Sequence, residues 1–340
     1  MLVIARLALF SLLCCYFSNS FSQTYPDKNL DRNLSLAINY TISQNYNSAE
    51  LILKKIDKEY PNIPIGKIYL AALTITKSVD YAEEFDKKLI YYYLNKAEEQ
   101  SDSLIDTDLK NPWFAYFAGL TNAYKAYFHA EEGNYLSALI KGFTAISYFN
   151  ECLKIDSSFA EAKAALGIYT YWKSFKIKGL DFLPFVNDNR EKAINQIEES
   201  IRFTVYNKYL IVHSLFWIYA NEKEFKRAAS LAELALKPFP NSHSFLSDYA
   251  HALKQFDKPK SILIYKRLLK SYQAQKKSNR INEIITKHKI AIVYNEMGNK
   301  TAALKICKEI LQDKNIPESS MKYLSERIQR IKEMKKELEN

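Results

Sequence analysis

The sequence predicts an all-α fold, an α-α superhelical solenoid built from a series of helix pairs. Three observations support this fold class. The 340 residues include only 7 Gly and 9 Pro, too few turn-forming residues for a many-stranded β protein. Apolar residues recur at steps of three and four, which places them on one face of an α-helix. One arrangement of such residues also occurs three times along the chain, as in a repeat protein.

The recurring arrangement is clearest when three segments are aligned on Ala49, Ala228 and Ala303. An apolar pair lies thirteen and twelve residues before each alanine, a tyrosine nine before, and small or apolar residues four and seven after. The members are Leu36, Ala37, Tyr40, Leu53 and Ile56; Leu215, Phe216, Tyr219, Ala232 and Ala235; and Ile290, Ala291, Tyr294, Cys307 and Ile310. Nine residues span a helix end, a short turn and a new helix start, and the small alanine allows the second helix to pack closely on the first.

This register resembles that of the tetratricopeptide repeat (TPR) family, and the resemblance covers most of the chain after residue 22. Pro61 and Pro240 lie twelve residues after the aligned alanine in two segments, where the family ends its second helix. Phe216 departs from the pattern, because that position usually holds a small residue. Residues 63–101 are helical in character but not in register.

The N-terminus predicts a secretory signal peptide over residues 1–22. An apolar run covers residues 7–17, and Ser20 and Ser22 lie three and one before Gln23, the spacing that signal peptidase requires. The run is about half of the roughly 20 apolar residues that a membrane span needs. We therefore expect an exported protein (periplasmic, cell-envelope or secreted) that begins near Gln23.

Two alternatives for the N-terminus stay open. The segment could remain as an uncleaved anchor, or a lipid could be attached at Cys14 or Cys15, although neither follows the small residue that lipidation prefers. Beyond the signal, only Cys152 and Cys307 remain, and their separation predicts two buried thiols rather than a zinc or redox site.

The predicted organisation after the signal is a helical-repeat region over 23–316 and a C-terminal capping helix over 317–340. An apolar, Pro-containing insert over about 173–189 interrupts the repeats and is similar to one in the tetratricopeptide domain-39 group. It either folds back onto the helices or contacts a partner or membrane surface. The aromatic residues of the insert that would make a membrane contact are Phe175, Phe182 and Phe185.

Candidate binding residues follow from the family resemblance, in which the first helix of each pair lines a concave groove. Its inward positions, carried over by register, are Tyr171, Trp172, His213, Trp217, Asn221, His251, Lys254, His288 and Asn295. Aromatic faces with polar tips suit an extended peptide. The alternative is that these aromatic residues pack between helices.

The sequence predicts no enzyme and no cofactor. There is no glycine-rich phosphate loop, nucleophile elbow or His pair at metal-ligand spacing. A three-histidine metal site from His213, His251 and His288 is one alternative. The formal net charge of +10 permits an acidic partner or an anionic membrane, while no nucleic-acid motif is present.

The leading functional hypothesis is a non-catalytic scaffold of the cell envelope or extracellular space that binds a protein or peptide in its groove. The runner-up is a glycan- or lipid-binding helical repeat protein that uses the insert over 173–189. The partner and the oligomeric state do not follow from the sequence.

Overall fold

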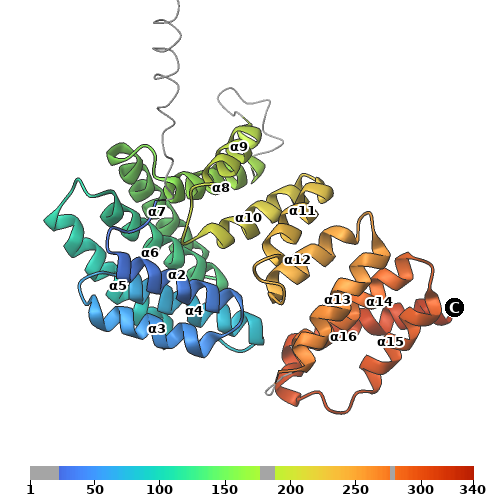
Figure 1. Ribbon diagram of the computed structural model, residues 1–340. Coiled ribbons are helices and arrows are strands. Elements are labelled where there is room, and N and C mark those ends of the chain that lie inside the picture. The colour runs from blue at the N-terminus through green and yellow to red at the C-terminus, as the bar shows by residue number, and fades with distance from the viewer. Residues whose placement is uncertain (1–22, 177–187, 276–279) are drawn as a thin grey trace, which may run out of the picture.

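The computed structural model describes residues 23–176, 188–275 and 280–340, which form helices without a single strand (Figure 1). The predicted signal peptide and most of the predicted insert, including Phe182 and Phe185, lie outside these residues. The helices are α2 (Lys28–Ile42), α3 (Tyr46–Glu59), α4 (Ile65–Tyr81), α5 (Lys87–Thr107), α6 (Pro112–Glu131), α7 (Tyr135–Ile155), α8 (Ala160–Lys176), α9 (Arg190–Ser200), α10 (Lys208–Asn221), α11 (Phe225–Leu236), α12 (His243–Leu253), α13 (Lys258–Gln273), α14 (Ile281–Glu296), α15 (Lys300–Gln312) and α16 (Glu318–Glu339).

Each of these helices packs mainly on its neighbours in sequence, so that α2 to α15 form consecutive pairs and α16 follows the last pair. This is the all-α solenoid of tetratricopeptide-type helix pairs that the sequence predicts. The pair α4–α5 occupies the segment whose register was unclear, and its helices are longer than those of the next-to-last pair, α12–α13. None of the described helices is long and apolar enough to span a membrane.

The predicted repeat register is confirmed at the aligned alanines. Ala49, Ala228 and Ala303 are all fully buried, each on the second helix of its pair. In the first segment, only one residue of the predicted apolar pair is buried: Ala37 is buried, but Leu36 is 40% exposed. Consecutive helical residues are about 100° apart, so only one of the two faces the partner helix here.

The turn inside a pair has a recurring backbone geometry. Gln44, Lys223 and Gly298 lie five residues before the aligned alanines, and each has a positive φ, of 58°, 61° and 77°. The next residue donates its N–H to the carbonyl of the recurring tyrosine, as Glu224 does to Tyr219 at 2.8 Å. A left-handed residue that closes such a bond ends a helix and reverses the chain.

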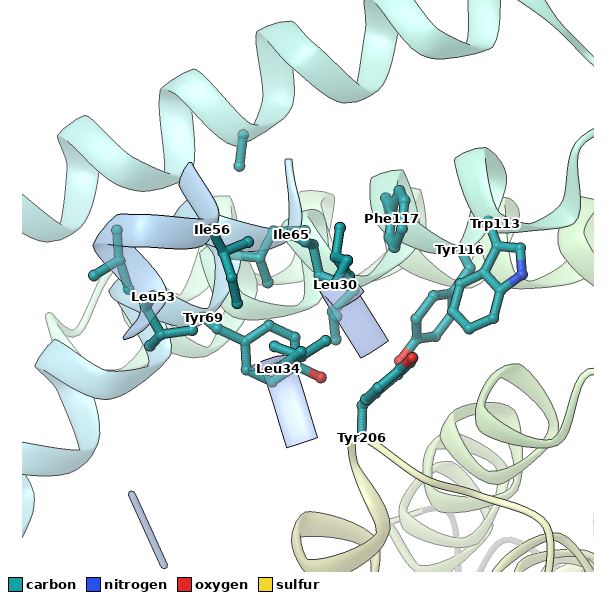
Figure 2. Close-up of a cluster of buried hydrophobic side chains, with 14 of the residues drawn as sticks. Leu30, Leu34, Leu53, Ile56, Ile65, Tyr69, Trp113, Tyr116, Phe117 and Tyr206 are labelled. Atoms are coloured by element: carbon teal, nitrogen blue, oxygen red, sulfur yellow. The ribbon is translucent and has the colours of Figure 1, made fainter. Parts of the chain in front are cut away.

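The N-terminal core joins segments that are far apart in sequence. Figure 2 shows the apolar side chains of α2, α3, α4 and α6 packed together, with the loop before α10 reaching in through Tyr206. The labelled residues are Leu30, Leu34, Leu53, Ile56, Ile65, Tyr69, Trp113, Tyr116, Phe117 and Tyr206. The Tyr206 hydroxyl donates to Asp31 on α2 at 2.7 Å and accepts the N–H of Tyr25 at 2.8 Å, which fixes the start of the described chain against this loop.

A buried carboxyl group organises the same loop. Glu161 on α8 is 2% exposed. Its Oε1 accepts the backbone N–H groups of Val205, Tyr206 and Asn207 at 3.1, 2.7 and 3.4 Å. Its Oε2 accepts the Tyr116 hydroxyl at 2.6 Å and the Asn207 side-chain amide at 2.7 Å. One side chain thereby connects α6, α8 and the chain entering α10.

The end of α4 contacts the C-terminal helices and connects the two halves of the stack. Asp80 accepts a hydrogen bond from His243 Nδ1 at 2.7 Å, and His243 Nε2 lies 2.7 Å from the Ser271 hydroxyl. The Asn282 side chain donates to the Asp80 carbonyl at 2.8 Å, and Glu84 forms an exposed ion pair with Lys322. These contacts join α4 to α12, α13, α14 and α16, so the solenoid curls back on itself.

The last helix, α16, presents one buried stripe to α14 and α15. Leu324, Ile328, Ile331 and Met334 belong to it, as the step pattern predicts. Met321 was expected in this stripe but is 39% exposed, and the neighbouring position, Ser320, is buried instead.

Candidate functional site

The first helices of the last four pairs, together with α16, form one continuous face, which we call the first-helix face. It consists of α8, α10, α12, α14 and α16. Helix α10 contacts both α8 and α12, and α14 contacts α16. Side chains connect α12 to α14, since Lys289 donates to Ser247 at 3.3 Å and Lys254 forms a 2.7 Å ion pair with Glu296. Any ligand that runs along this face crosses four or five helices.

Three of the predicted groove residues come together on this face. Trp217 is 41% exposed, and its indole N–H donates to His213 Nε2 at 3.3 Å. The centroid of its ring lies 5.1 Å from that of His251 on the next first helix, with the rings tilted by 44°. Phe216 supports the group from below: it is buried, and its ring meets that of Trp217 edge-on at 5.3 Å. The departure at Phe216 from the repeat pattern thus positions the exposed indole.

A buried carboxyl group fixes the imidazole of this cluster. Asp248 on α12 is 2% exposed, and its Oδ2 lies 2.6 Å from His213 Nδ1. Burial raises the pKa of Asp248 despite the neighbouring His213 and Lys289. Burial by itself would lower the pKa of His213, but the hydrogen bond to Asp248 and the negative charge of Asp248 together outweigh burial, so the pKa is raised. Because Nδ1 faces Asp248, Nε2 remains to accept the Trp217 indole.

Other predicted groove residues are structural. Tyr171 is fully buried, so its assignment to the ligand-facing surface was wrong. Its hydroxyl donates to Glu222 at 2.7 Å and accepts a hydrogen bond from the Asn221 side-chain amide at 2.7 Å. The amide of Asn221, another predicted groove residue, is therefore bonded within the protein. Trp172 is half-buried and packs edge-on against Tyr171 and Phe175, at 5.1 and 5.8 Å between ring centroids. Phe175 therefore packs on its own helix.

The remaining predicted groove residues, His288, Lys254 and Asn295, do not form an open groove either. His288 is 4% exposed, because α16 covers it: Arg327 lies 3.3 Å from its Nδ1. Burial, together with the charges of Arg327 and Arg330, lowers the pKa of His288 to about 4. Lys254 is paired with Glu296, and Asn295 is half-buried beside that pair. Among the predicted groove residues, all of which lie in the described part of the chain, Trp217 and its neighbours therefore combine exposure with a fixed arrangement.

Sequence reasoning missed the positive charges next to this region. Lys289, one residue beyond the predicted His288, lies between α12 and α16, and Arg327 and Arg330 project from the same side of α16. Burial and the charges of Lys289 and Lys254 lower the pKa of His251, so this imidazole is neutral near pH 7. Helical spacing alone did not show that α16 contributes to the face, because α16 was interpreted only as a cap.

The geometry gives little support to the three-histidine metal hypothesis. His213 uses both ring nitrogens for Asp248 and Trp217, and His288 is covered by an arginine. Across the described ranges, no three His, Cys, Asp or Glu side chains are grouped so that they could hold a metal ion.

The chain Asp80–His243–Ser271 has the acid–imidazole–hydroxyl order of a nucleophilic triad. However, His243 is 4% exposed, and its ring lies 4.4 Å from that of Tyr272. The imidazole is therefore buried between its neighbours, and the arrangement is best explained as the connection of α4 to α12 and α13.

A second exposed surface lies on α7, outside the first-helix face. Its N-terminal half carries a stripe of large apolar side chains that are at least half exposed. They are Tyr135, Leu136, Leu139, Ile140 and Phe143. This α7 stripe is the natural competitor to the first-helix face in any binding experiment.

Comparisons with known proteins concern architecture only. No protein-family model and no curated protein sequence matches the chain. Among solved structures, it is similar to YrrB, a TPR protein with an unusual peptide-binding site, with 13% identity, a TM-score of 0.45, and coverage of 64% of this chain and 95% of YrrB. The chain is also similar to PilW, a type IV pilus biogenesis factor, with 15% identity and a TM-score of 0.45. This match covers 75% of this chain and 98% of PilW. A third similar structure is a human IFIT1 dimer with m7Gppp-AAAA, with 13% identity and a TM-score of 0.44. This match covers 86% of this chain and 61% of the IFIT1 chain. At these TM-scores none of the similarities carries an argument about function.

Proposed function

We propose that this tetratricopeptide-type solenoid is a non-catalytic scaffold that binds a protein or peptide partner on its first-helix face. The observation that carries the proposal is the exposed Trp217 indole, held by His213, His251 and Phe216. Interface energy concentrates in a few aromatic and Arg residues. A ring that is already fixed loses little conformational freedom when a ligand covers it, which favours affinity.

Trp217→Ala is expected to weaken peptide binding about 10- to 30-fold, in the range of an aromatic hot spot. A displayed library of random ten-residue peptides is selected on the purified wild type, and the most enriched peptides are synthesised with a fluorophore. Their Kd values for the wild type and the variant are then measured by fluorescence anisotropy.

Phe143→Ala is the matched control, because it removes an exposed aromatic ring from the α7 stripe. Its Kd should equal that of the wild type. If Phe143→Ala weakens binding and Trp217→Ala does not, the binding surface is the α7 stripe and the proposal is wrong.

We further propose that the protein is exported to the cell envelope or the extracellular space and begins at Gln23. Cleavage there is compatible with the fold, since the Gln23 side chain donates to Asp156 at 2.8 Å and accepts the N–H of Ala160 at 3.2 Å. The expected result is an exported protein whose intact mass corresponds to residues 23–340. A cytoplasmic protein that retains residues 1–22 would contradict the proposal.

A further inference from the structure

Three cationic side chains on the first-helix face have no carboxylate partner. Lys289 on α14 and Arg327 and Arg330 on α16 form no ion pair within the described parts of the chain, although Glu326 and Glu333 lie one helical turn from Arg330. Lys289 donates only to the Ser247 hydroxyl and lies over the Tyr265 ring at 5.7 Å. Arg327 contacts the His288 ring rather than an acid.

These cations repel one another. Burial, followed by the charge of Arg327, lowers the pKa of Lys289, and burial together with Arg330 lowers the pKa of Arg327. Asp248 attracts Lys289, but this carboxyl group is buried and already bonded to His213. Like charges that the fold leaves uncompensated destabilise it, and an anion bound from outside would relieve that repulsion.

The charged group continues the row that begins at Trp217. The order along the face is Trp217 on α10, His251 on α12, Lys289 on α14 and Arg327 on α16. Packed helices are about 8–10 Å apart, so three helix steps correspond to roughly 25–30 Å. An extended peptide rises about 3.3 Å per residue, and about eight residues therefore span the row.

We propose that Lys289, Arg327 and Arg330 bind the carboxylates of an acidic peptide segment whose apolar or aromatic residue, about eight positions away, covers Trp217. This inference rests on the proposed function and adds the chemistry of the partner to it. Arginine favours carboxylates through its planar fork of donors, and Lys289 adds a point charge between α12 and α16. A face with three cations at one end and an exposed indole at the other fits an amphipathic peptide better than a uniformly charged polymer.

The peptide library that tests the proposed function also tests this inference. Peptides enriched on the wild type should combine an aromatic or large apolar residue with two or more Asp or Glu toward one end. The double substitution Lys289→Gln with Arg327→Gln should weaken these peptides at least tenfold. It should also reduce the dependence of Kd on NaCl between 50 and 300 mM. Lys336→Gln, an exposed position on another side of α16, should leave both quantities unchanged.

Folding of the double variant is checked separately. Since it removes repulsion between cations, its melting temperature should equal or exceed that of the wild type, so lost binding cannot be attributed to unfolding. Peptide enrichment without acidic residues, or equal Kd values for wild type and double variant, would overturn the inference. Should Trp217→Ala still weaken binding in that case, the proposed function stands. If no peptide binds the wild type, both fail.

A final arm uses a single-stranded oligonucleotide of random sequence. Binding of this polyanion more tightly than any peptide, with loss of binding in the double variant, would assign the cations to nucleic acid and overturn the peptide inference.

Discussion

Glu161→Ala should lower the free energy of unfolding by about 3–5 kcal/mol, measured by urea denaturation. The reason is the set of five donors that converge on this side chain. Tyr206 and Asn207 would keep buried backbone N–H groups without an acceptor, and Val205 a part-buried one; each group that water cannot reach costs about 1–3 kcal/mol. The loss should also free the loop before α10 and raise amide exchange at residues 203–207.

Glu161→Gln is the informative companion variant. Its amide oxygen can still accept the three backbone N–H groups, while its new NH₂ group faces two donors, the Tyr116 hydroxyl and the Asn207 amide. We expect a smaller loss, about 1–2 kcal/mol. Equal stability of the wild type and Glu161→Ala would show that water or another group replaces the carboxyl, contrary to its burial.

Asp80→Ala should be the second large effect, with a loss of about 2–4 kcal/mol in unfolding free energy. His243 is buried, and its Nδ1 would lose its hydrogen-bond partner. The contact joins α4 to α12 across 163 residues of sequence, so the variant should also exchange amide protons faster in α12 and at the start of α14. Hydrogen–deuterium exchange with mass spectrometry measures that difference.

Two controls separate this contact from its surroundings. Asp80→Asn keeps the Oδ1 acceptor for His243 and should lose less stability than Asp80→Ala. Glu84→Gln changes only the exposed contacts with Lys322 and Tyr323 and should cause no measurable change. If Glu84→Gln is as damaging as Asp80→Ala, the exposed pair, and not the buried imidazole, connects the two halves.

Local spacing was sufficient to predict the helix pairs. The nine-residue spacing from the recurring tyrosine to the aligned alanine predicts a helix end, a turn and a helix start. Ala49, Ala228 and Ala303 are buried as expected. The same reasoning failed at Leu36 and Met321, since periodicity identifies a helix face but not its exact edges.

The candidate site was only partly predictable, because a face is exposed or covered according to distant segments. Trp217, His213 and His251 do lie together. Tyr171 and His288 occupy positions that register assigns to the surface, yet Asn221 and Glu222 enclose the first and Arg327 covers the second. Those partners are 39 to 51 residues away, and no local pattern encodes them.

The exposure of Trp217 has an optical consequence. Of the three tryptophans in the chain, Trp113 is 6% exposed inside the N-terminal core and Trp172 is half-buried against Phe175, whereas Trp217 is 41% exposed. The long-wavelength part of the intrinsic emission therefore arises mainly from Trp217. Its indole N–H donates to an imidazole, so the same emission senses both a covering ligand and the protonation of His213. The chain thus carries a fluorophore at the surface where binding is proposed, and its titration needs no label.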